Sequence, residues 1–303
     1  MVVTPTTRQP HAARISRSSI TIKAPGKLNV YLRITGKRPD GYHEIESVFV
    51  PVTLYDTLNI AKMKQGLKVS CAGRELPEGP ENLVYRAAHG FFEETGIKDG
   101  ARITLVKEIP ISSGLGGGSS DAAATLKGLN TLWDEPLAGK DLERLALSLG
   151  ADVPFFLVQR PAIARGIGEL LEPLRVFPLF WYVIVSPDLM VSTAWAYGEV
   201  RLRLTQGGNE NILNIFDATA LKIPDLLFND LESVTLGKYP FLCSIKESLL
   251  ALGALGALMT GSGPSIFGVF ESAHKANQAG DTLKSTWSNY DVFVVKGWSG
   301  GVR

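Results

Sequence analysis

Cysteine is scarce in this sequence, and so is any grouping of residues that would hold a metal cluster. Only two cysteines, Cys71 and Cys243, occur among 303 residues, and they lie far apart without metal-ligand spacing. This count excludes a disulfide framework and is typical of a reducing compartment. We therefore expect a cytoplasmic protein.

Long apolar runs and an excess of charge of one sign are also missing. The longest apolar stretches, Val176–Val185 and Leu249–Met259, are interrupted by proline or glycine and are too short to cross a membrane. The formal net charge of +1 provides no basic field for nucleic acid. We expect a globular protein with no membrane or nucleic-acid partner, as a monomer or homodimer that the sequence does not distinguish.

The two common nucleotide-binding motifs are absent as well. A P-loop needs Gly-Lys followed by Ser or Thr, and none of the four Gly-Lys pairs is followed by either. The dinucleotide-binding pattern G-x-G-x-x-G fails because Ser119 stands where its last glycine should be. Any phosphate site in this chain must therefore belong to another architecture.

A glycine-rich segment over residues 110–121 (PISSGLGGGSSD) is the most informative feature that is present. The alternating run over 102–109 predicts a strand before it, and apolar residues at helical spacing over 122–133 predict a helix after it. Glycines let backbone N–H groups point inward, and the start of a helix adds free N–H groups and positive potential. We predict a phosphate site here rather than a flexible linker, because Ser-Asp and an amphipathic helix follow at once.

Three other short stretches place polar side chains at breaks between predicted elements. Lys27 follows a Pro-Gly break between strands, while Tyr42 and His43 follow a Pro-Asp-Gly turn and could stack on a flat ring. Asp152 precedes Pro154 at a helix start, where it is either an N-cap residue or a general base. From the residues alone, an ordinary surface lysine, a core tyrosine and a solvated histidine stay open as alternatives.

The remaining pattern alternates between strand and helix throughout the chain. In the first part we expect strands over 19–24, 28–34, 46–52, 57–61, 67–71 and 162–169, and helices over 82–92 and 142–149. Prolines around 170–178 suggest a domain boundary. The second half reads strand, helix, helix, strand, strand, helix, strand, starting with a strand over 179–185 and with an irregular segment over 209–216.

Six short stretches of the chain resemble motifs of the GHMP small-molecule kinases, the superfamily of galactokinase, homoserine kinase and mevalonate kinase. The six occur along the chain in the order that this family has. Three carry the general resemblance: 24–29, 110–123 and 260–265. Three more narrow it to the cytidine-recognising kinases of the methylerythritol phosphate route to isoprenoids: 38–43, 150–156 and 229–232. The resemblance covers about residues 20–296.

The resemblance implies an α+β fold of two domains with the active site in the cleft between them. The first, over 20–174, would be similar to the second domain of ribosomal protein S5 and would bind ATP and carry the catalytic residues. The second, over 175–303, would be a ferredoxin-like α+β domain. Residues 1–19 lie outside the resemblance; they are basic and contain no acid, and we expect a disordered or loosely attached extension rather than a piece of a transit peptide.

The activity implied is ATP-dependent phosphorylation of the 2-hydroxyl of a small-molecule substrate, the cytidine-diphospho derivative of methylerythritol, giving the 2-phosphate and ADP. ATP would be the phosphoryl donor, and Mg²⁺ is expected with it. Another small alcohol, such as homoserine or mevalonate, is the alternative within the superfamily. A catalytically inactive sensor that binds ATP and a ligand is disfavoured because both Lys27 and Asp152 are present. An RNA-binding protein is disfavoured by the near-neutral net charge.

The resemblance also assigns roles to individual residues. Asp152 would be the catalytic base, and Lys27 would hold it ionised and offset charge on the transferred group. The residues assigned to ATP are Asn82, Leu83, Lys107, Pro110, Ile111, Ser112, Ser113, Gly114, Leu115, Gly116, Gly117, Gly118, Ser119 and Ser120. Those assigned to the substrate are Asn29, Tyr42, His43, Thr193 and Tyr197, with Tyr197 opposite the Tyr42–His43 pair across the cytosine. No residue is assigned to a metal.

Two departures from the family pattern lie near this site. Residues 111–113 replace part of the usual glycine run before the leucine, and 159–161 (Gln-Arg-Pro) stand where the family has a glycine pair. Asp121 is interpreted as an N-cap or first-turn residue of the helix, because a carboxylate facing the phosphates would repel them unless a metal intervened.

Overall fold

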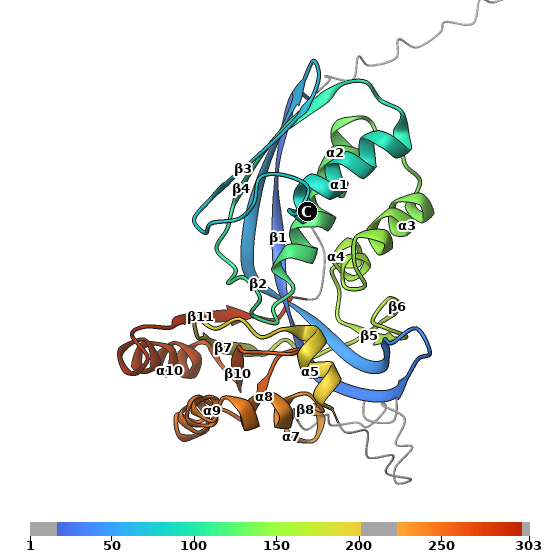
Figure 1. Ribbon diagram of the computed structural model, residues 1–303. Helices are drawn as coiled ribbons and strands as arrows, with labels where there is room; N and C mark the ends of the chain where they lie inside the picture. The colour runs from blue at the N-terminus through green and yellow to red at the C-terminus, as the bar shows by residue number, and fades with distance from the viewer. Residues whose placement is uncertain (1–16, 201–222, 299–303) are drawn as a thin grey trace, which may run out of the picture.

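Two β-sheets form the framework of the computed structural model, which describes residues 17–200 and 223–298. The first sheet carries helices α1 to α4 on one face, and α9 and α10 lie against the second sheet (Figure 1). The predicted α+β class is confirmed. The parts of the extension and of the irregular segment that fall in 1–16 and 209–216 lie outside the described residues.

The first sheet is built on one long antiparallel hairpin, strands β1 (Ser19–Lys37) and β2 (His43–Met63). The strand order is β3-β4-β2-β1-β8, and β5 pairs with both β2 and β6. The other members are β3 (Leu67–Ala72), β4 (Gly100–Val106), β5 (Ala162–Arg165), β6 (Leu170–Pro173) and β8 (Phe228–Asn229).

The helices on this sheet are α1 (Leu83–Thr95), α2 (Gly117–Leu132), α3 (Gly139–Leu149) and α4 (Val153–Val158). Local chemistry sets several of their ends. The Asn82 side chain accepts the Val84 N–H at the start of α1, and Gly96 ends that helix in the left-handed region. Gly150 ends α3, as predicted.

The second sheet has the order β11-β7-β10-β9 and is antiparallel throughout. This order, with helices between β7 and β9 and between β10 and β11, is the ferredoxin-like arrangement. Its strands are β7 (Trp181–Ser186), β9 (Gly256–Met259), β10 (Ile266–Phe270) and β11 (Asp291–Lys296). The accompanying helices are α5 (Thr193–Glu199), α7 (Ile223–Leu226), α8 (Glu232–Lys238), α9 (Phe241–Ala251) and α10 (Ala273–Thr286).

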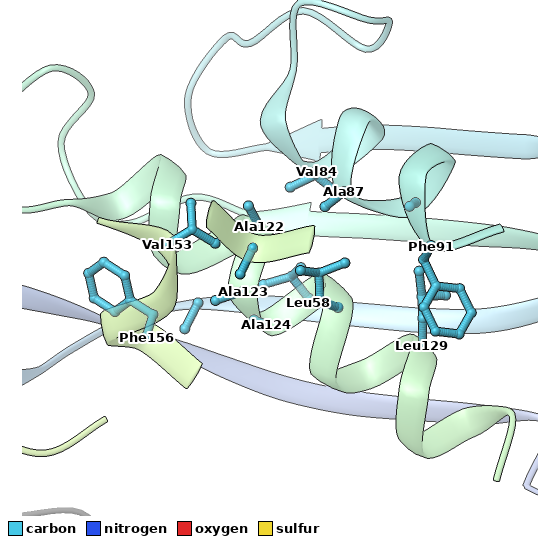
Figure 2. Close-up of a cluster of buried hydrophobic side chains, with 14 of the residues drawn as sticks. Leu58, Val84, Ala87, Phe91, Ala122, Ala123, Ala124, Leu129, Val153 and Phe156 are labelled. Atoms are coloured by element: carbon cyan, nitrogen blue, oxygen red, sulfur yellow. The ribbon is translucent and has the colours of Figure 1, made fainter. Parts of the chain in front are cut away.

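The largest buried cluster joins α1, α2 and α4 to the first sheet (Figure 2). Ala122, Ala123 and Ala124 are fully buried in α2, and their small side chains let this helix lie close to its neighbours. Phe91 of α1 and Phe156 of α4 fill the space at either end of the cluster. The start of α2, which follows the glycine-rich segment, is therefore held in a rigid core.

Three local predictions were wrong. The expected break at Pro25-Gly26 is a shift of register inside one continuous strand, because β2 supplies extra residues opposite it. For the same reason the separate strands expected over 46–52 and 57–61 are one strand, β2. Helix α2 begins at Gly117 after a left-handed Gly116, which places Asp121 in the second turn rather than at the N-cap or in the first turn.

The two sheets are joined at several points. β8, which comes from the second half of the chain, pairs in parallel with β1. Close to β11, the Trp298 N–H donates to the Pro51 carbonyl at 2.8 Å. The domain boundary near residue 174 stays a prediction. Within the described residues, no helix is long and apolar enough to cross a membrane.

Truncating Phe91 to alanine is expected to cost about 3–5 kcal/mol of folding free energy, because the ring is fully buried and leaves a cavity. Phe241→Ala, the same change at a side chain that is 37% exposed, is the control and should cost less. Urea unfolding curves measure both. Equal losses would contradict the core described above.

Candidate active site

A cavity of about 1110 Å³ lies where the two halves of the chain meet. Its walls come from the β1–β2 hairpin, Lys107, the glycine-rich segment up to Ser119, the start of α4, the start of α5 and the turn after β9. Because these segments are far apart in sequence, the cavity exists only in the folded chain.

The glycine-rich segment is held in place by backbone contacts at several points. The Lys27 N–H donates to the Leu115 carbonyl at 2.9 Å, and the Ser265 N–H donates to the Ser113 carbonyl at 3.3 Å. The Ser113 hydroxyl donates to the Pro110 carbonyl within the segment. These contacts fix the loop that leads into α2, and so they fix the position of the free N–H groups at the start of that helix beside the cavity.

Gly114 marks the closest approach between this loop and the turn after β9. A Cβ atom at Gly114 would lie 2.2 Å from the Thr260 carbonyl oxygen, and the residue has a φ of 81°. The Thr260 hydroxyl donates to the Gly114 carbonyl at 3.4 Å and accepts the Asn29 N–H at 2.9 Å. Only glycine fits both the space and the backbone conformation.

Lys27 and Asp152 form an ion pair in the wall of the cavity. The Lys27 Nζ lies 3.8 Å from Asp152 Oδ2, and the lysine side chain is 6% exposed while that of the aspartate is 35% exposed. Asp152 occupies the N-cap position of α4 without capping it through its side chain, so the carboxylate faces the cavity. The Asn29 amide oxygen accepts a hydrogen bond from Lys27, and the Phe49 ring lies under the ammonium.

Burial lowers the pKa of Lys27, and the charge of Asp152 partly opposes that shift. The Lys27 ammonium therefore lies in a poorly solvated position beside a single carboxylate. Such an ammonium interacts strongly with any further negative charge that enters the cavity.

Three aromatic rings also line the cavity. His43 is buried, and its ring centre is 5.4 Å from that of Tyr197, with the planes inclined at 32°. Tyr42 is 60% exposed at the rim. Burial, followed by the charge of Lys37, lowers the pKa of His43. Burial and the Asp152 carboxylate raise the pKa of Tyr197, so the phenol is neutral.

The segment 229–232 forms hydrogen bonds to the turn after β9, which lines the cavity. The Asn229 amide donates to the carbonyls of Met259 and Gly261, both at 2.8 Å. The Glu232 carboxylate accepts the Met259 N–H at 2.9 Å. These residues hold the turn after β9 in position rather than lining the site.

Comparison with known proteins agrees with this geometry. The family model described as the GHMP kinases N terminal domain matches residues 82–160, and the GHMP kinases C terminal model matches 214–289. Two curated relatives named 4-diphosphocytidyl-2-C-methyl-D-erythritol kinase are 43% and 42% identical to this chain. That of Syntrophotalea carbinolica aligns with 90% of this chain and 97% of its own length, and that of Geobacter metallireducens with 91% and 97%.

The chain belongs to the 4-diphosphocytidyl-2-C-methyl-D-erythritol kinase family.

Solved structures are consistent with this membership. A crystal structure of 4-(cytidine 5'-diphospho)-2C-methyl-D-erythritol kinase superposes with a TM-score of 0.80 at 37% identity and covers 93% of this chain and 100% of its own. Homoserine kinase from Cytophaga hutchinsonii has a TM-score of 0.74 at 22% identity, covering 97% and 98%. The second likeness shows a shared fold alone.

Most residues assigned from the resemblance to this kinase family line the cavity. They are Lys27, Asn29, Tyr42, His43, Leu83, Lys107, Pro110, Ile111, Ser112, Ser113, Gly114, Gly116, Gly117, Gly118, Ser119, Asp152, Thr193 and Tyr197. Three others do not: Asn82 caps α1, Leu115 lies in the core, and Ser120 is buried within α2. Lys107 lines the wall, but its ammonium faces the carboxylates of Asp56 and Asp121.

Sequence reasoning missed several lining residues. Asp40 and Ser262 lie inside motifs that were recognised, and Lys37 lies next to one, so these motifs could have indicated them. Phe49 and Ile167 carry no such signal, because apolar residues in strands and turns occur throughout the chain. Ser262 is tied to the predicted Thr193, with 3.0 Å between their hydroxyl oxygens.

Both departures from the kinase family pattern place a residue in the left-handed region that favours glycine. Ser112 has a φ of 52°, and so does Gln159 at the end of α4. In each case a larger residue occupies a backbone conformation that glycine would adopt without strain. The course of the loops is therefore compatible with the family's glycines.

Replacing Gly114 by alanine is expected to destabilise the protein by more than the ~1–2 kcal/mol of a left-handed residue, because the new Cβ also meets the Thr260 carbonyl. Gly253→Ala is the matched control, since Gly253 has a φ of 88° with nothing within 4 Å of an added Cβ. Thermal unfolding measures the loss of stability in each variant. Equal losses in Gly114→Ala and Gly253→Ala would contradict the close approach at Gly114.

Acidification is expected to destabilise the wild-type protein relative to His43→Asn. The pKa of His43 in the folded state lies below its ordinary value of 6.5, so the unfolded state takes up the proton more readily. Stability contributed by the neutral ring is therefore lost as the pH falls below 6.5. The free energy of unfolding is measured between pH 5 and pH 8, with His89→Asn on the exposed face of α1 as control. A relative gain in wild-type stability on acidification would contradict the burial of His43.

Proposed function

We propose that this chain transfers the γ-phosphoryl group of ATP to the 2-hydroxyl of 4-diphosphocytidyl-2-C-methyl-D-erythritol, giving the 2-phosphate and ADP, in the methylerythritol phosphate route to isoprenoid precursors. The observation that carries the proposal is the Lys27–Asp152 pair, which lies in one cavity with a helix start on one side and an aromatic corner on the other. Two relatives above 40% identity, both named 4-diphosphocytidyl-2-C-methyl-D-erythritol kinase, support the same substrate.

The ATP phosphates lie against the glycine-rich segment in this proposal. Gly116, Gly117 and Gly118 line the cavity at the start of α2, where N–H groups lack partners within the helix. These N–H groups and the positive potential of the helix end bind negative oxygens. Leu76 and Leu83, which also line the cavity, offer an apolar surface for the nucleoside.

Asp152 acts as the general base. Its carboxylate removes the proton of the substrate 2-hydroxyl while that oxygen forms a bond to the γ-phosphorus. The bond between the γ-phosphorus and the bridging oxygen breaks, and ADP leaves with that oxygen. Lys27 offsets charge on the transferred group, and Asn29 orients Lys27 through its amide oxygen.

The aromatic corner binds the cytosine. Tyr42 and His43 present a ring face and hydrogen-bonding nitrogens, and Tyr197 supplies a neutral ring on the other side. In this structure His43 and Tyr197 contact one another, so the base would separate them or stack against Tyr42 at the rim. Thr193 also lines the cavity and is hydrogen-bonded to Ser262.

Mg²⁺ arrives with ATP in this proposal. The described residues contain no group of three His, Cys, Asp or Glu side chains that could hold a metal ion. The oxygen donors of the cavity, including Asp152 and Ser119, fit an ion that takes most of its ligands from phosphates and water. When bound, the ion withdraws negative charge from the phosphate oxygens.

The cytoplasm is the compartment we propose. Both cysteines, Cys71 and Cys243, are free thiols in the structure, as a reducing compartment requires.

The proposed reaction is tested by measuring ADP release with Mg-ATP and 4-diphosphocytidyl-2-C-methyl-D-erythritol, with homoserine and mevalonate as competing alcohols. Asp152→Asn is expected to lower the turnover number by about 10²–10⁴, because a general base contributes about that much. Asp281→Asn, on the exposed face of α10, is the matched control.

Turnover of the cytidine substrate that survives in Asp152→Asn would remove Asp152 from the role of base. Turnover of another alcohol alone would contradict the aromatic corner as a cytosine site while leaving the kinase fold in place.

A further inference from the structure

Three charged side chains are buried together beneath the start of α2. The Lys107 ammonium contacts the carboxylate of Asp56 on β2 and lies 3.3 Å from Asp121 Oδ2 on α2. None of the three side chains is more than 2% exposed. The cluster lies outside the Lys27–Asp152 pair and has no part in the phosphoryl-transfer step described above.

Asp56 is surrounded by donors. Its Oδ2 accepts from Lys107, and its Oδ1 accepts the N–H groups of Glu108 and Ile109 at 2.7 and 2.9 Å. A carboxylate with an ammonium and two amide donors is stabilised in its ionised form. Through these bonds Asp56 fastens residues 107–109, which directly precede the glycine-rich segment, to β2.

Asp121, in contrast to Asp56, has few hydrogen-bond donors around its carboxyl group. One oxygen faces Lys107, while Oδ1 is buried and has no hydrogen-bond donor among the described residues. If both carboxylates were ionised, the cluster would hold two negative charges against one positive charge. An uncompensated charge at this depth is costly unless the group takes up a proton.

The position of the cluster makes its net charge important for the site. A Cβ atom at Gly117 would lie 2.7 Å from the Lys107 ammonium, so the cluster lies directly under the first residue of α2. A net negative charge there would act against the helix-end potential that binds phosphate.

We propose that Asp121 carries a proton, so that the cluster is neutral and fastens the start of α2, together with residues 108 and 109, to β2 without opposing the phosphates. Asp56 is a positioning residue in this arrangement, because it acts on ATP only through the loop. The consequence for ATP rests on the proposed function, whereas the protonation of Asp121 does not.

The surroundings of Asp121 support the proton. Burial, reinforced by the charge of Asp56, raises the pKa of Asp121 well above its ordinary value, and Lys107 opposes the shift only in part. The other titratable group near it is Cys71 on β3, and burial raises the pKa of that thiol, which keeps it neutral. No second cation reaches the cluster within the described residues.

The protonation is tested by the pH dependence of folding stability in wild type and Asp121→Asn, measured by urea unfolding between pH 4 and pH 8 without any substrate. Because the folded state of the wild type keeps a proton that the unfolded state loses above pH 4, wild-type stability falls relative to the variant as the pH rises. The unfolding constant of the wild type should increase relative to that of the variant by up to about tenfold per pH unit until the raised pKa is passed.

Asp121→Leu, which leaves the Lys107–Asp56 pair neutral, provides the same comparison if the asparagine variant does not fold. A ratio that is flat above pH 5, or wild-type stability that falls on acidification, would mean that Asp121 is ionised and would overturn the proposal.

The positioning role is tested by kinetics at pH 7. Asp56→Asn is expected to raise the KM for ATP by about tenfold or more, the scale of a lost charge-assisted hydrogen bond, with a smaller effect on kcat. Asp121→Asn, which keeps a donor without a charge, should raise that KM less than Asp121→Ala does. An unchanged KM in Asp56→Asn would overturn the positioning role. Absence of any turnover in the wild type would contradict the proposed function and leave the stability result intact.

Discussion

The long β1–β2 hairpin is the constraint on which the rest of this structure depends. Its two strands run through all three buried clusters, with Ala24 in the first, Leu28 in the second and Leu32 in the third. Apolar burial in each cluster therefore fixes the hairpin along its whole length. Lys27 lies between the first two of these positions, so the lysine that faces the cavity is set by the packing of both halves.

Both buried lysines of the site are placed against carboxylates, but with different consequences. Lys27 has one partially exposed partner, Asp152, and the cavity beyond it is open to a substrate. Lys107 has two fully buried partners and is closed off from further charge. Burial makes each interaction strong, and access to the cavity distinguishes a group that can take part in chemistry from one that holds a loop in place.

Sequence motifs predicted the structure correctly where it depends on residues that are close together in the chain. The strand, glycine-rich turn and helix around residues 110–121 follow from glycine, from free N–H groups and from helical spacing, and the resemblance to the GHMP kinases rests on motifs that are contiguous in sequence. The errors arose where tertiary pairing overrides a local break. Pro25-Gly26 signals an interruption, yet β2 pairs across it and the strand continues. Aspartate is a common N-cap residue, yet α2 begins after Gly116, and the Asp121 carboxylate lies beside Lys107 instead.

The sequence by itself determined the fold class, the family and the residues able to bind phosphate or move a proton, because periodicity and short motifs carry that information. Only the tertiary structure decided which of them share a cavity, since Lys27, Asp152 and Tyr197 come from β1, the start of α4 and α5. It alone brought Asp56, Lys107 and Asp121 together, because no spacing in the chain encodes a contact between β2, the end of β4 and α2. Burial, which gives a charged group its chemical character, is a property of packing rather than of residue type.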